Sequence, residues 1–225
     1  MGFSVEKLWT SNGGFSGMRD VTKAFRKGAG LIHFEGHGNP EFWGNFLPEA
    51  ETEREMVTGL LVRYMRFLYN GDMLPVVVCG GCHNAQFNVT FLNLILGILR
   101  DGISFFNLTE PYGDFWLVEW VPYDWASRLL LVGNGGSIAT IGNSGLGWAT
   151  PDEAYIESLT GWLEPRFFDA YANQSKETVG NALSQAITDY INIIGEVNSD
   201  SHDRKTIEEW ILIGDPSLKI GGYEI

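Results

Sequence analysis

The chain has 225 residues, of which 44% are hydrophobic, so it can bury the core of one well-packed domain. Its formal net charge of −13 argues against an electrostatic grip on nucleic acid or on an anionic membrane, because phosphate recognition requires basic patches. The 2 cysteines exclude a disulfide-dense scaffold, and no apolar run reaches the length of a membrane-spanning helix. The first residues lack the basic start and apolar stretch of a signal peptide.

Helices and strands alternate along the first half of the chain. The periodicity predicts a weak strand at 5–9, a helix at 18–26 capped by Ser16, a strand from residue 30 that ends at His37, and a loop at 39–48. An apolar stripe of Met56, Leu60, Tyr64 and Phe67 predicts a helix at 52–68. A β-branched run after Pro75 predicts a buried strand that reaches Cys79.

The second half is mainly helical, with two further strands. We expect helices at 91–99, 122–130, 151–159, 164–172 and 176–194, and strands at 137–142 and 210–213. The aromatic segment 101–121 is expected to be irregular, and 198–203 to be a polar surface loop. Because no repeat or linker interrupts this pattern, we expect one α/β domain over 1–225 with a mostly parallel sheet flanked by helices.

Two of the predicted strands end in glycine-flanked reactive residues. His37 lies between Gly36 and Gly38, and Cys82 follows Gly80-Gly81. Because the carboxyl ends of parallel strands share one edge of a sheet, neighbouring strands would bring His37 and Cys82 together. The strand at 137–142 would add its own loop there, in which Asn143, Ser144 and Trp148 are candidates to line a substrate cleft.

A cysteine beside a histidine at a strand end is typical of nucleophilic catalysis. The thiolate is the attacking form, and an imidazole can accept and return its proton. The backbone N–H groups of Gly38 and Cys82 could stabilise the oxyanion of a tetrahedral intermediate. The residues alone leave a structural role open as well, because free cysteine is among the most buried residue types.

Three other chemistries share these residues. Cys79-Gly80-Gly81-Cys82 could be a redox dithiol, and with His83 it fits the C-x-x-C-H signature of covalent haem attachment. Zinc could be held by Cys79, Cys82, His83 and His37, although no second ligand pair accompanies them. His33, inside a strand, is interpreted as a packed core histidine, and His202 as part of a polar surface loop.

Four short motifs occur in order: Gly36-His37-Gly38-Asn39 with Trp43, then segments 81–87, 135–143 and 213–218. Together they resemble the gingipain-type cysteine peptidases, peptidase family C25. The resemblance implies a caspase-like three-layer α/β sandwich that cleaves peptide bonds through an acyl-enzyme. It assigns the nucleophile to Cys82, the acid/base role to His37 and the oxyanion hole to Gly38 and Cys82. Cys79 then becomes a buried strand residue.

The same resemblance implies a polypeptide substrate, no cofactor and no metal, and an extracellular or cell-surface location; it assigns no oligomeric state. The family's catalytic domain is usually longer, with an additional N-terminal subdomain, so we expect this chain to be the C-terminal part of a longer peptidase domain. Segment 101–121 resembles an insertion that could cover the site. The alternative function is a catalytically silent binding module with the same fold.

Overall fold

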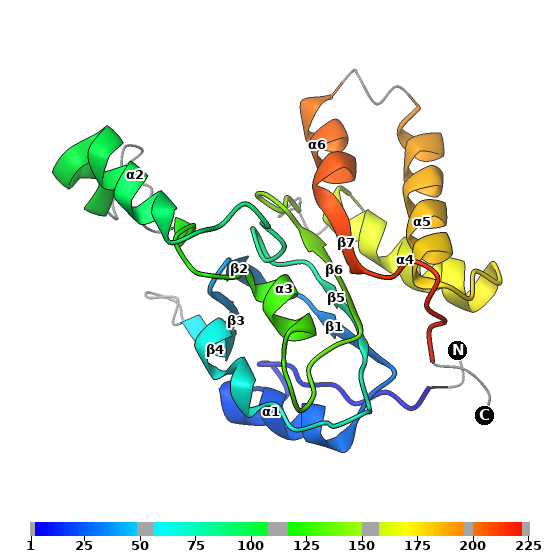
Figure 1. Ribbon diagram of the computed structural model, residues 1–225. Helices are drawn as coiled ribbons and strands as arrows, with labels where there is room; N and C mark the ends of the chain where they lie inside the picture. The colour runs from blue at the N-terminus through cyan, green and yellow to red at the C-terminus, as the bar shows by residue number, and fades with distance from the viewer. Residues whose placement is uncertain (1–2, 49–55, 108–116, 150–157, 196–199, 222–225) are drawn as a thin grey trace.

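A computed structural model describes residues 3–48, 56–107, 117–149, 158–195 and 200–221 (Figure 1). Its main sheet has the strand order β1 (Leu31–Phe34), β5 (Val76–Cys79), β6 (Ala139–Asn143) and β7 (Trp210–Gly214). β1, β5 and β6 are parallel, and β7 closes one edge antiparallel to β6. All four residues of β5 are buried, as expected of a central strand covered on both faces.

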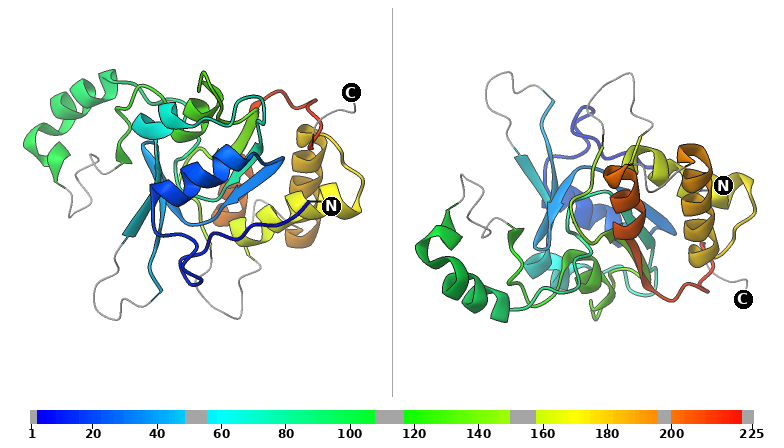
Figure 2. Two further views of the ribbon diagram at one scale, coloured as in Figure 1. Left: turned by 90° about the horizontal axis from the view of Figure 1, so that it is seen from below. Right: turned by 90° about the horizontal axis from the view of Figure 1, so that it is seen from above.

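Helices cover both faces of this sheet (Figures 1 and 2). On one face Val76 and Val78 pack in a core with α4 (Thr160–Asn173) and α5 (Val179–Ile194). On the other face Val77 and Cys79 join the core formed with α1 (Met18–Lys27), α3 (Trp125–Leu130) and the 3-10 helix η1 (Val62–Phe67). α6 (Ser201–Glu209) leads directly into β7. Because successive side chains of β5 point to opposite faces of the sheet, this one strand contacts both helical layers.

A second, antiparallel sheet adjoins the main one. It consists of β2 (His37–Asn39), β3 (Phe42–Phe46) and β4 (Met56–Leu61), in that order. The predicted loop at 39–48 was therefore wrong, and so was the predicted helix at 52–68 where the structure describes it, since β4 is followed by η1. A Cβ at Gly59 would overlap the Trp43 ring. Strand pairing and this close approach outweigh the helical spacing of Met56 and Leu60.

Most of the remaining predictions are confirmed with shifted ends. The helix at 18–26 is α1, but its N-terminus has no cap from Ser16; instead the Asp20 carboxylate accepts hydrogen bonds from the Ser16 backbone and hydroxyl, each of 2.8 Å. Residues 5–9 form no strand, and the polar loop predicted to end at residue 203 enters α6, which Asp200 caps. The predicted helix at 151–159 lies almost wholly outside the described residues.

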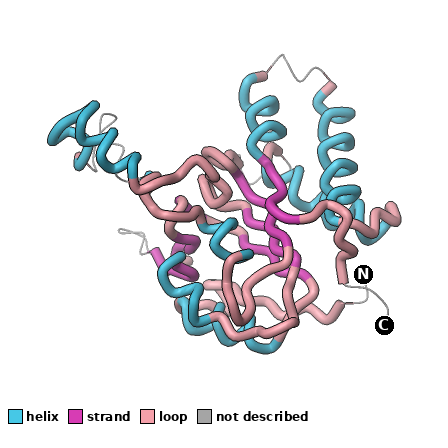
Figure 3. The backbone as a smooth tube through the Cα atoms, in the orientation of Figure 1, coloured by secondary structure: helices cyan, strands magenta, loops and turns pink. Residues whose placement is uncertain are grey.

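α2 (Leu92–Asp101) and the 3-10 helix η2 (Gly102–Phe106) project from the body of the molecule (Figure 1). α2 is the helix predicted at 91–99, and η2 occupies the start of the segment 101–121, which is predicted to be irregular. Residues 108–116 lie outside the described part. Figure 3 shows the strands gathered in the middle of the molecule, with helices around them. No helix among the described residues is long and apolar enough to cross a membrane.

Candidate active site

The two predicted reactive loops leave the sheet at the same edge. β1 and β5 are adjacent parallel strands whose last residues, Phe34 and Cys79, are paired. The Gly80 N–H then donates to the Phe34 carbonyl at 2.8 Å, so the two backbone segments separate only beyond this hydrogen bond. The strand expected to end at His37 stops at Phe34, and His37 instead begins β2. His37 therefore lies on a hairpin that follows β1.

Asn84 joins the histidine hairpin to the cysteine loop. Its Nδ2 donates to the carbonyls of Asn39 (2.8 Å) and Phe42 (3.0 Å), and its Oδ1 accepts from the Cys79 thiol at 3.2 Å. The side chain is completely buried. A Cβ at Gly38 or at Gly81 would overlap its Oδ1, so the glycines beside both reactive residues are needed for this packing. Asn84 lies within the 81–87 motif, but the sequence alone indicated no role for it.

The Cys82 loop is tied to the loop after β6. The His83 N–H donates to the Gly145 carbonyl (2.7 Å), and Asn143 Nδ2 donates to the Gly80 carbonyl (3.2 Å). Cys82 is half-buried, and its Sγ donates to the Gly147 carbonyl at 3.5 Å. Burial raises the pKa of the Cys82 thiol, so the loop holds a protonated thiol near neutral pH.

His83 carries a strained backbone directly after Cys82. Its φ of +54° lies in the left-handed region, which non-glycine residues rarely adopt. The ring is held because His83 Nδ1 lies 2.6 Å from Gln86 Oε1, and Gln86 Nε2 donates to Glu119 at 2.8 Å. A strained residue fixed by half-buried side-chain hydrogen bonds is typical of a functional turn.

The other predicted site residues occupy different environments. His37 is exposed, with its ring 4.8 Å from that of Phe46 in an edge-on arrangement. Asn143 is only 1% exposed, and its side chain stabilises the cysteine loop through the hydrogen bond to the Gly80 carbonyl. Trp148 is 41% exposed and packs against His202 at 5.1 Å between ring centroids. Ser144 is half-buried, and its N–H donates to the Glu209 carbonyl at 2.8 Å.

Lys205 is a residue near Cys82 that the sequence did not indicate. It lies on α6, and its Nζ donates to the Leu146 carbonyl at 2.8 Å and pairs with Glu209 at 2.9 Å. Its positive charge lowers the pKa of the Cys82 thiol and partly offsets the effect of burial, whereas Glu209 acts in the opposite direction. The tertiary fold brings this charge to the loop, because α6 lies more than a hundred residues away along the chain.

Cys79 and Cys82 occupy separate environments, and both are free. Cys79 is completely buried, is directed at Asn84, and has its pKa raised well above the ordinary value by burial. The ligand atoms proposed for zinc, from Cys79, Cys82, His83 and His37, do not converge among the described residues. The geometry thus favours Cys82 over Cys79 as the reactive thiol and offers no site for the zinc alternative.

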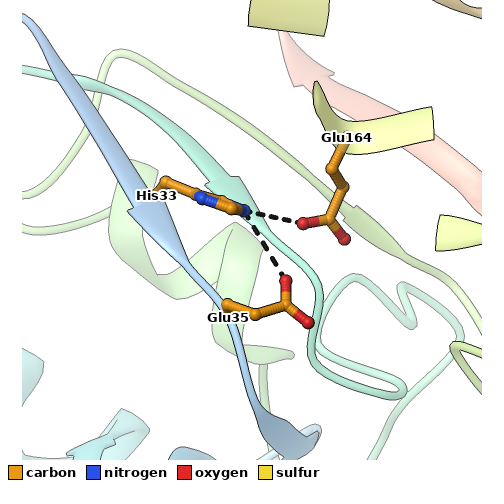
Figure 4. A group of neighbouring side chains, drawn as sticks. All are labelled: His33, Glu35 and Glu164. Atoms are coloured by element: carbon orange, nitrogen blue, oxygen red, sulfur yellow. Dashed lines mark hydrogen bonds and ion pairs between the residues drawn. The ribbon is translucent and has the colours of Figure 1, made fainter. Parts of the chain in front are cut away.

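His33, Glu35 and Glu164 form a different cluster (Figure 4). His33 Nε2 is 2.7 Å from a Glu164 oxygen and 3.6 Å from a Glu35 oxygen. His33 is not the packed core histidine that was expected, since 38% of its side chain is exposed. Desolvation, and then the charge of Glu164, raise the pKa of Glu35 to about 8, and desolvation raises that of Glu164 to about 7. Glu164, from α4, had no signal in the sequence.

The solved structures that the chain resembles are proteinases with a caspase-like fold. The crystal structure of the Arg-specific cysteine proteinase gingipain R aligns over 91% of this chain and 36% of its own, with a TM-score of 0.57 and 15% sequence identity. The complex of the Porphyromonas gingivalis RgpB pro- and mature domains aligns with a TM-score of 0.56 and 16% identity, over 91% of this chain and 37% of that one. The chain thus spans little more than a third of these structures.

The sequence comparison gives the family. The model of peptidase family C25 matches residues 3–221, which is nearly the whole chain. The chain therefore belongs to peptidase family C25. The family and the caspase-like α/β fold agree with what the four motifs implied. No curated protein sequence matches the chain.

Proposed function

We propose that this chain carries the catalytic pair of a cysteine endopeptidase, with Cys82 as nucleophile and His37 as acid and base. The observation that supports the proposal most is the packing of Asn84 between Gly38 and Gly81. Through it the hairpin bearing His37 and the loop bearing Cys82 form one packed unit at the edge where β1 and β5 end. Membership of family C25 supports the same pair of residues.

The proposed reaction begins from the thiol, because Cys82 Sγ–H donates to the Gly147 carbonyl in the resting site. As Sγ bonds to the substrate carbonyl carbon, its proton passes to the His37 ring, and the carbonyl oxygen becomes an oxyanion. The N–H groups of Gly38 and Cys82 are proposed to bind that oxyanion. His37 then protonates the amide nitrogen, and the C–N bond breaks to leave a thioester. Water hydrolyses the thioester and returns a proton to Sγ.

The substrate is proposed to be a polypeptide, and the setting extracellular or at the cell surface, as for the family. We assign residues 1–225 to one catalytic unit of a longer peptidase domain. Within this proposal Trp148 and Ser144 line the substrate side of the Cys82 loop, since Trp148 is 41% exposed. Asn143 positions the loop rather than touching substrate, since it is buried and bonds to the Gly80 carbonyl.

A peptide-based, thiol-directed electrophile tests the proposal on this chain. We expect it to label the unchanged protein and Cys79→Ser but not Cys82→Ala. Cys79→Ser is the matched control because its hydroxyl can keep the bond to Asn84. His37→Ala should abolish hydrolysis of a fluorogenic peptide mixture. Labelling that persists in Cys82→Ala would refute the assignment, and failure to label any of these proteins would favour the silent binding module.

A further inference from the structure

The cluster of His33, Glu35 and Glu164 lies outside the proposed catalytic pair. His33 is on β1, the edge strand of the main sheet, and Glu35 follows two residues later on the same side. Glu164 comes from the first turns of α4, which packs on that face of the sheet. Figure 4 shows the three side chains pointing toward one another from these elements. The cluster therefore bridges the sheet edge and a helix.

The two carboxyl groups compete for one positive partner. His33 Nε2 can donate a single hydrogen, yet it lies 2.7 Å from Glu164 and 3.6 Å from Glu35. Glu164 is 2% exposed, and its second oxygen, Oε1, is buried with no hydrogen-bond partner among the described residues. A buried carboxylate oxygen without a partner costs on the order of 1–3 kcal/mol or more. When both carboxyl groups are ionised, the cluster thus carries two negative charges beside one imidazole, and Glu164 Oε1 is an unused ligand atom.

The oxygens converge on a backbone position that has no side chain. A Cβ at Gly80 would lie 2.5 Å from Glu164 Oε1 and 2.6 Å from Glu35 Oε2. One ligand atom from each of the three side chains lies within 4.8 Å of the others. In a tetrahedral zinc site with bonds of about 2.0–2.1 Å, ligand atoms lie roughly 3.3 Å apart. The two separations that involve His33, 2.7 and 3.6 Å, bracket that value.

We propose that His33, Glu35 and Glu164 form a binding site for a divalent transition-metal ion of the zinc class. One imidazole nitrogen and two carboxylate oxygens are ligands that such ions accept, and three protein ligands leave a fourth position open. Ions reach the site from solvent, because 38% of the His33 side chain and 62% of the Glu35 side chain are exposed. The metal would tie α4 to the start of the hairpin that carries His37.

Direct binding measurements test the site without using peptidase activity. The chain, free of any histidine tag and in the Cys82→Ala background, is dialysed against Zn²⁺ and its bound metal is counted. Co²⁺ then serves as a spectroscopic probe, because thiolate ligation adds a charge-transfer band that nitrogen and oxygen ligands lack. We expect one ion per chain, a Co²⁺ spectrum without the thiolate band, and a raised Tm with Zn²⁺.

Glu164→Gln keeps the shape of the side chain but removes its charge. Glu35→Gln is the second variant, because its mostly exposed side chain can change without disturbing the core. Each should weaken Zn²⁺ binding by more than the roughly 10- to 100-fold that loss of an outer-shell partner costs. Glu177→Gln is the control, since that exposed carboxylate pairs with Lys219 and is not a member of the cluster.

Three outcomes would overturn the proposal. They are an absence of Zn²⁺ binding at millimolar concentration, binding that both variants retain, and a Co²⁺ spectrum with thiolate ligation. Because Cys82 is absent throughout, these results are independent of whether the chain cleaves peptides. If the Cys82→Ala protein binds zinc but the peptide electrophile does not label the unchanged protein, this metal site is supported and only the peptidase proposal is refuted.

Discussion

Replacing Asn84 by alanine should separate the His37 hairpin from the Cys82 loop. The change removes the donors to the Asn39 and Phe42 carbonyls and leaves a gap against Gly38 and Gly81. Each buried carbonyl left without a donor costs about 1–3 kcal/mol, so we expect the free energy of unfolding to fall by about 2–5 kcal/mol. Guanidinium denaturation monitored by tryptophan fluorescence measures this loss.

Asn70 provides a matched control at the other end of the strands. It is 1% exposed, its Nδ2 donates to the carbonyls of Met73 (2.7 Å) and Gly136 (3.0 Å), and its Oδ1 accepts from Gly136 N–H (2.8 Å). Asn70→Ala should therefore cost a similar free energy of unfolding. Asn70 lies in the connection that leads into β5, and its partner Gly136 lies in the connection that leads into β6. The reactive loops follow the other ends of these two strands.

The two variants should differ in the ratio of two labelling rates at Cys82, measured by mass spectrometry. Iodoacetamide reports only the exposure and ionisation of the thiol, whereas a peptide electrophile also requires an ordered site. Asn84→Ala should lower the peptide-to-iodoacetamide ratio, while Asn70→Ala should keep the ratio of the unchanged protein. The reasoning fails if both ratios fall equally, or if Asn84→Ala leaves both stability and ratio unchanged.

Three further predictions follow from charge and packing. Lys205→Met should raise the pKa of the Cys82 thiol further, so the pH midpoint of its iodoacetamide alkylation should move upward; a downward move would contradict the arrangement. The pKa of Glu164 is raised from 4.5 to about 7, so its contribution to stability is present below pH 4.5 and is lost as pH rises through 7. Denaturation in chelator should show a fall in stability across that range, to which Glu35 also contributes because its pKa is raised to about 8. Glu164→Gln should reduce the fall by about 3 kcal/mol at most. Gly80→Ala should destabilise the fold by about 1–3 kcal/mol through contact with the Glu164 carboxyl, whereas Gly133→Ala, whose Cβ would meet nothing within 4 Å, should lie within about 0.5 kcal/mol of the unchanged protein; equal losses would refute the crowding at Gly80.

The elements that local sequence determined are those whose signal is contained in adjacent residues. The valine run of β5 is a strand because β-branched side chains suit a strand covered on both faces. The glycines beside His37 and Cys82 lie next to the reactive residues in the sequence itself, and the order of the α/β units predicted a shared edge for the strand ends. These features depend on a few neighbouring residues and on the general rules of parallel sheets.

Other features depended on partners distant in the chain. Met56–Leu61 has apolar spacing that suits a helix, but pairing with β3 and the contact of Gly59 with Trp43 make it β4. Asn84 forms a hydrogen bond to the His37 hairpin, and the charge of Lys205 acts on Cys82, although each pair comes from separate elements. Glu164 meets His33 across 131 residues. Local sequence therefore determined the strands of the main sheet and the reactive residue types. Only tertiary packing decided the second sheet and the neighbours of the reactive residues, because electrostatic and hydrogen-bond partners are selected by distance in space.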